Sequence, residues 1–85
     1  MSSHPTDFSG SVTLALREAI EGKIPGATAE VSGGGGHFSL VVAAPAFAGL
    51  GMLEAHRMVY AAIAPLMAGD QAPVHAIDTL KTRAP

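Results

Sequence analysis

The stretch that decides the fold is the helix-like run from Met52 to Met67, which contains Ala55-His56-Arg57-Met58-Val59-Tyr60. Apolar side chains recur in this run at the spacing of one helical stripe. We assign that stripe to Leu53, His56, Val59, Tyr60, Ile63 and Met67. Pro65 lies inside the run and predicts a kink or an early loosening near Ala61, because proline removes a backbone hydrogen bond.

Val74-His75-Ala76-Ile77 follows the long helix closely and predicts the start of a last strand, from Val74 to Thr82. The register of this strand stays open, because Val74, Ala76 and Leu80 compete with Ile77 for the buried face. The sequence thus places a histidine-arginine pair on a helix and a second histidine at the opening of a strand.

The first half of the chain predicts a helix followed by a hairpin. The helix begins after Ser11 or Ser9, either of which can cap it, and Gly22 is expected to end it. Its apolar stripe consists of Val12, Ala15, Leu16, Ala19 and Ile20. Alternating patterns then predict two strands, at residues 27–32 and 37–43, joined by a flexible tip of four glycines, Gly33 to Gly36.

Together these elements predict one α+β domain over residues 11–85, after a flexible N-terminal arm over residues 1–10. The expected order is helix, strand, strand, helix, strand, with a short helical turn within residues 46–50 before the long helix. Both helices should cover one face of the sheet, which gives a two-layer sandwich.

Composition excludes several classes of function. A chain of 85 residues buries only about 60 to 65 per cent of its unfolded surface, so we expect no deep catalytic cavity. No cysteine occurs, which excludes disulfides and any thiolate metal site made by this chain alone. The sequence also lacks a Gly-x-Ser-x-Gly elbow and a carboxylate pair forced together by its spacing, so we do not expect an enzyme.

Charge and hydropathy bear on partners and location. The formal net charge of −2 gives no general attraction for nucleic-acid phosphates. The longest apolar run, Leu40 to Leu50, is shorter than the ~20 residues that span a bilayer, and the N-terminus lacks the basic head and apolar body of an export signal. We therefore expect a cytoplasmic protein.

The His56-Arg57 pair, the Val74-His75-Ala76-Ile77 motif and Phe47-Ala48-Gly49-Leu50 together resemble the BolA family, and the resemblance extends from Leu14 to Thr82. It implies the same α-β-β-α-β order, in a fold like the second class of KH domain. It also implies that His75 ligates a [2Fe-2S] cluster shared with a monothiol glutaredoxin, with glutathione contributing a thiolate through the glutaredoxin. The expected role is iron homeostasis or iron-sulfur cluster trafficking.

Shared ligation agrees with the composition, because iron in such clusters is normally held by thiolates and this chain has none. A neutral imidazole ligand removes negative charge from the cluster and raises its reduction potential. Its bond to iron is sensitive to protonation near the ordinary histidine pKa of about 6.5. Such a ligand suits sensing or handing over a cluster better than storing one.

The resemblance places a second ligand in the loop between the first two strands, where His37 is the only candidate. The family's loop ligand often comes several residues earlier, about where Gly35 stands. His37 is therefore either the second ligand or a residue that caps the strand on its polar face. We expect Gly35, Gly36 and Arg57 to contact the partner, and the isolated chain to be a monomer.

Two residues of the long helix have plainer interpretations. His56 is expected to be partly buried with its nitrogens hydrogen-bonded, and Tyr60 to fill core space with its hydroxyl near the rim.

The alternative function is a KH-like, nucleic-acid-binding transcriptional regulator, a role also assigned to BolA proteins together with the stress response. Gly49-Leu50-Gly51-Met52 is one residue short of the Gly-x-x-Gly spacing of KH domains and lacks a basic residue.

Overall fold

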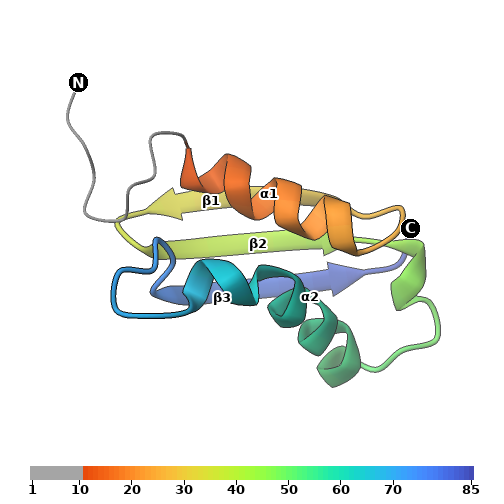
Figure 1. Ribbon diagram of the computed structural model, residues 1–85. Coiled ribbons are helices and arrows are strands. Elements are labelled where there is room, and N and C mark those ends of the chain that lie inside the picture. Colours follow the sequence, from red (N-terminus) through yellow and green to blue (C-terminus); the bar gives the residue numbers. More distant parts are fainter. Residues whose placement is uncertain (1–10) are drawn as a thin grey trace.

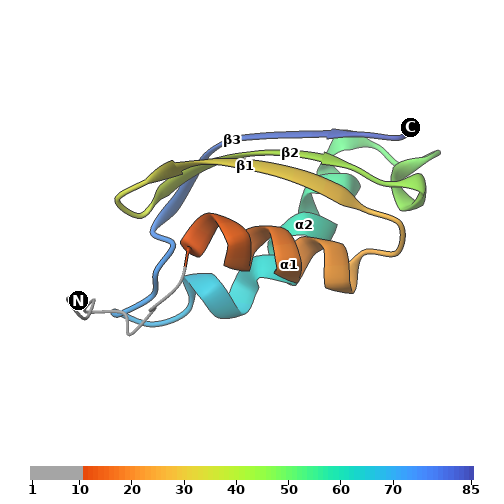
Figure 2. The same cartoon turned by 90° about the horizontal axis from the view of Figure 1, so that it is seen from above.

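The computed structural model describes residues 11–85, so the predicted N-terminal arm and Ser9 lie outside the described residues. Both helices lie on one face of a three-stranded sheet, which runs in the order β1-β2-β3 (Figures 1 and 2). The α+β order and the two-layer arrangement are therefore confirmed. The elements are α1 (Val12–Lys23), β1 (Thr28–Gly34), β2 (His37–Ala43), the 3₁₀ turn η1 (Pro45–Phe47), α2 (Met52–Met67) and β3 (Ala76–Arg83).

Helix α1 begins as predicted but continues past Gly22, its predicted stop, to Lys23. The Ser11 hydroxyl accepts a hydrogen bond from the backbone N–H of Leu14, at 3.2 Å, which caps the first turn. Gly22 lies inside the helix, so its expected role as the stop is wrong. The helix ends instead at Ile24, whose backbone is extended, with φ −108° and ψ 111°. Its N–H makes the last helical hydrogen bond, to the Ile20 carbonyl at 3.0 Å.

The hairpin between β1 and β2 is tighter than predicted. The strands are antiparallel and Gly34 lies opposite His37, so only Gly35 and Gly36 form the turn. Their φ angles of +63° and +87° are those of the two central residues of a type I′ turn, whose twist matches that of the flanking strands. The predicted four-glycine loop is therefore wrong, because the strand pairing continues through the first two glycines.

A β-bulge explains why the register of β3 stayed open. β3 runs parallel to β2, with Phe38 opposite Ile77, but the next residue of β2, Ser39, lies opposite Thr79. Asp78 is thus the extra residue of a bulge. Ile77 and Leu80 are three residues apart, so in a regular strand their side chains would point to opposite faces. Because the bulge lies between them, both lie opposite buried residues of β2. The strand also begins at Ala76, two residues later than predicted.

The buried stripe of α2 differs from the predicted one. It consists of Ala55, Val59, Ala62 and Ile63, whereas Leu53 and Tyr60 are 63% and 41% exposed. The prediction for Tyr60 as a core residue is therefore wrong. Ala55 and Ala62 are buried beside Val59 and Ile63, whereas the larger Leu53 and Tyr60 face solvent. A hydrophobicity pattern does not favour this arrangement, because it ranks leucine above alanine. His56 is half-buried, as expected.

Helix α2 continues without a break past Ala61 and Pro65 to Met67, so no early loosening occurs there. Among residues 11–85, no helix combines the length and the apolar character needed to cross a bilayer.

The core lies between the two helices and the inner face of the sheet. Leu16, Ile20, Leu40, Val59 and Ile63 are completely buried, so the core is mainly aliphatic. Within residues 11–85, both helices lie on the inner face and none covers the other face of the sheet (Figure 2). That open face carries the alternate residues of β2, beginning with His37, which are exposed or only half-buried.

Candidate functional site

Backbone hydrogen bonds join the hairpin turn to the start of β3. The carbonyl of Gly36 accepts from the N–H groups of both His75, at 2.8 Å, and Ala76, at 3.0 Å. Val74 is buried, and its N–H donates to the carbonyl of Leu66 near the end of α2, at 3.2 Å. The two residues before β3 are therefore held from two sides, His75 by the turn and Val74 by the helix.

The imidazole of His75 lies against Gly36 and is exposed to solvent. A Cβ atom at Gly36 would come within 2.9 Å of Cγ of His75 and even closer to Cδ2, so no larger residue fits there without moving the ring. Gly36 is thus required twice, for its positive φ angle and for this close approach. The ring that the sequence predicts to be a ligand is accessible and is set by a rigid backbone.

His37 is the first residue of β2, and its side chain turns toward Asp78 on the open face of the sheet. Nδ1 of His37 lies 3.1 Å from Oδ1 of Asp78, and the two side chains are 60% and 54% exposed. Asp78 was not predicted as part of the site. No sequence signal pointed to it, because its position beside His37 depends on the parallel pairing and on the bulge.

Gly35 and Arg57, which are also predicted to contact the partner, lie in different parts of the molecule. A Cβ atom at Gly35 would contact nothing, so this residue faces open space at the tip. Arg57 is exposed on α2, nine residues before Leu66 and therefore about 13 Å from it along the helix axis. The structure thus places His75 against Gly36, the residue before His37, and leaves Arg57 apart. Within residues 11–85, no three His, Asp or Glu side chains are grouped as a metal site.

A cavity of about 370 Å³ lies beside the hairpin turn. It is formed between the beginning of α1 and the glycine segment of the hairpin, and none of its lining side chains is charged. Its walls are Ser11, Val12, Thr13, Gly33 to Gly36, Phe38 and Pro73. The candidate site is therefore bordered by a neutral depression with much exposed backbone.

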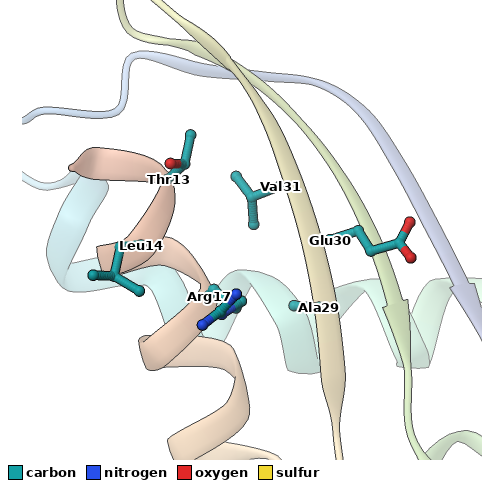
Figure 3. Close-up of a pocket in the computed structure, with 6 residues that line it drawn as sticks. All are labelled: Thr13, Leu14, Arg17, Ala29, Glu30 and Val31. Carbon is teal, nitrogen blue, oxygen red and sulfur yellow. The ribbon is translucent and has the colours of Figure 1, made fainter.

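A second cavity, of about 360 Å³, lies between α1 and the outer strand β1. Figure 3 shows Leu14 and Arg17 on the helix side and Ala29 and Val31 on the strand side, with the carboxylate of Glu30 pointing away from α1. No predicted site residue lines this cavity. It is therefore separate from the histidines.

Comparison with known proteins bears on the family. A family model described as BolA-like protein matches residues 15–85. A search of curated proteins gives no match.

Solved structures include a BolA protein homologue from Coxiella burnetii, which is 34% identical with a TM-score of 0.75 and covers 89% of this chain and 94% of that chain. BolA1 from Mus musculus is 31% identical with a TM-score of 0.68, covering 91% of this chain and 68% of that chain. The BolA domain of SufE1 from Arabidopsis thaliana, 23% identical with a TM-score of 0.72, covers 92% of this chain and 96% of that chain, and it shares the fold. The resemblance seen in the sequence is confirmed, and the chain belongs to the BolA-like family.

Proposed function

We propose that this protein binds a monothiol glutaredoxin and holds with it a bridging [2Fe-2S] cluster, in iron homeostasis or iron-sulfur cluster trafficking. The observation that carries the proposal is the exposed imidazole of His75, seated on Gly36 and tied to the hairpin turn by a backbone hydrogen bond. A donor held in this way presents its nitrogen to a partner without first having to be ordered.

The donor chemistry of the chain fits a shared cluster. Histidine replaces cysteine as an iron ligand in some [2Fe-2S] centres, and this chain offers imidazoles but no thiolate. The glutaredoxin and its bound glutathione would supply the sulfur donors. The missing Cβ at Gly36 leaves room for the His75 ring at the surface, so the residues present fit the role of a ligand-donating partner.

The cluster is cargo in this proposal, and the chain's own part is to bind, orient and release it. The backbone sets the direction of the His75 ring, and protonation of an imidazole removes the lone pair that a metal needs. We also assign the second ligand position to His37, and contacts with the glutaredoxin to Gly35 and Gly36 around the site and to Arg57 at a distance from it. A cytoplasmic location and a non-enzymatic role belong to the same proposal.

Nucleic-acid binding remains a prediction that no structural feature favours over the glutaredoxin partner. The five basic residues are distributed over three elements, and binding to phosphates usually draws on clustered bases. They are Arg17 and Lys23 on α1, Arg57 on α2, and Lys81 and Arg83 on β3.

Visible circular dichroism tests the proposal. Adding the purified chain to a cluster-loaded monothiol glutaredoxin should change the cluster spectrum and produce a heterodimer in size-exclusion chromatography. His75→Ala should abolish the spectral change and His37→Ala should reduce it, because each substitution removes a proposed ligand.

His56→Ala is the matched control, since it removes a half-buried histidine of α2. It should leave the cluster spectrum as in the wild type. The proposed ligand is wrong if His75→Ala, folded normally by far-ultraviolet circular dichroism, still gives the wild-type spectrum with the glutaredoxin.

A further inference from the structure

We propose that Asp78 is a positioning residue, which orients His37 so that its Nε2 atom is the second nitrogen donor to the shared cluster. This inference rests on the proposed function and deepens it. It assigns a role to a residue that lies in none of the three motifs that carry the family resemblance, and it decides between the two interpretations of His37 that the sequence leaves open.

The bulge in β3 creates the contact. Ala76 lies opposite His37 and Thr79 lies opposite Ser39, so Asp78 has no partner residue of its own on β2. Its side chain stands on the open face of the sheet and approaches His37, with Oδ1 at 3.1 Å from Nδ1. It is the one ion-pair geometry among residues 11–85.

The chemistry of the two groups decides which nitrogen is free. An ionised carboxylate has no hydrogen to donate, so Nδ1 of His37 is the donor. In the neutral ring Nε2 then carries the lone pair. A metal-ligating histidine almost always donates its other ring N–H to a carboxylate, a carbonyl or water, which sets both the tautomer and the orientation of the ring. The His37–Asp78 pair has this arrangement.

The backbones of both histidines are joined to the same residue of the turn, Gly36. His37 follows Gly36 in the chain, and the N–H of His75 donates to the Gly36 carbonyl. Contact with Gly36 sets the ring of His75, and the Asp78 carboxylate sets the ring of His37. A purely structural role explains the contact less well, because an ion pair this exposed contributes little to stability.

The first test uses the chain alone. Two-bond ¹H–¹⁵N correlations of the imidazoles, recorded at about pH 8 where histidines are mostly neutral, report which ring nitrogen carries the hydrogen. The Nδ1–H tautomer should dominate at His37 in the wild type. Asp78→Ala should remove this preference and Asp78→Glu should retain part of it. Glu30→Ala, which removes an exposed carboxylate from β1, should leave it unchanged.

The second test uses the heterodimer with a cluster-loaded monothiol glutaredoxin. Asp78→Ala should weaken the hold on the cluster by about 10-fold to 100-fold, measured as loss of the visible circular dichroism signal to a chelator. The double variant His37→Ala/Asp78→Ala should lose the cluster no faster than His37→Ala alone, because the carboxylate acts through the ring.

The inference is overturned if Asp78→Ala leaves the His37 tautomer and the cluster lifetime unchanged, or if the double variant is clearly worse than His37→Ala. The inference also fails, while the proposed function stands, if His75→Ala loses the cluster and His37→Ala holds it as the wild type does. If the wild-type chain takes up no shared cluster at all, the proposed function fails and this inference fails with it.

Discussion

The hairpin of the sheet and the beginning of α2 lie at opposite ends of the described residues (Figure 1). The two ends expose different side chains. At the hairpin end the exposed groups are two imidazoles and a carboxylate. At the other end they are the large apolar side chains of Leu50, Met52 and Leu53. Arg57 and Tyr60 are exposed farther along the same helix.

The two ends also differ in how firmly their side chains are held. His75 is set by Gly36 and by a backbone hydrogen bond, and His37 by Asp78. Met52 is 74% exposed, and no side chain caps the helix at Gly51 beside it. A free side chain must lose rotamer entropy before it can hold a ligand, whereas an oriented ring has already lost it. The proposed ligands therefore lie where the backbone is constrained, at the hairpin end, although more apolar surface is exposed where α2 begins.

The largest effect expected is that of Gly36→Ala. A Cβ atom there requires a left-handed backbone and meets the ring of His75, so the free energy of unfolding should fall by about 2 to 3 kcal/mol. Gly35→Ala is the matched control, since its φ angle is also positive but its Cβ atom would meet nothing. It should lose only about 1 kcal/mol in urea unfolding.

The difference between the two glycine variants reports the contact with His75. In the background of His75→Ala, Gly36→Ala and Gly35→Ala should become nearly equal, because the ring that the new Cβ atom meets is gone. An unchanged difference in that background would show that the close approach of the ring does not matter.

The second effect concerns the segment that leads into β3. Val74→Ala should reduce the free energy of unfolding by about 2 kcal/mol, because it leaves a cavity at a fully buried position beside the histidine site. Met52→Ala at the opposite end should change it by less than about 0.5 kcal/mol. Equal losses for the two variants in urea titrations would contradict the comparison.

The third prediction separates partner contact from ligation. Arg57→Ala should weaken the heterodimer with the glutaredoxin by less than about 10-fold, as expected for an exposed charge, and the loss should shrink at high salt. The visible spectrum of the bound cluster should not change, because Arg57 lies far from both histidines. Isothermal titration calorimetry at two salt concentrations measures the first quantity, and an altered spectrum would place Arg57 in the site.

The smallest effect expected is at the beginning of α2. Gly51→Ser should stabilise the protein by a few tenths of a kcal/mol, because serine can accept from the first-turn N–H groups and the φ angle of −74° suits any residue. Ser11→Ala, at the capped helix, should cost about 1 kcal/mol. Thermal unfolding of both variants checks the pair, and a destabilised Gly51→Ser would contradict this account of the uncapped end.

Much of the fold follows from local patterns. The stripe of α1 and its Ser11 cap, and the alternation in β2, each depend on neighbouring residues, and each was predicted correctly. The buried face of α2 was predicted correctly only in part, because Val59 and Ile63 are buried as expected but Ala55 and Ala62 are buried in place of Leu53 and Tyr60. The helical spacing of apolar residues in the sequence does not show how closely the helix packs against the sheet.

The candidate site divides in the same way. His75 and His37 were found from the sequence by their type and by the resemblance of the motif around His75. The separation of Arg57 from them, and the presence of Asp78, depend on which strands pair and in which register.

The sequence by itself determined the order of the elements, the family and the absence of thiolate donors, because helical and strand periods and composition are properties of the chain alone. Only the tertiary structure decided that two glycines make the turn, that a bulge brings Asp78 to His37, and that Gly36 supports the ring of His75. The turn depends on how far the pairing of β1 with β2 continues, and the other two features join segments that are distant in the chain. Such pairings and contacts exist only after the sheet has formed.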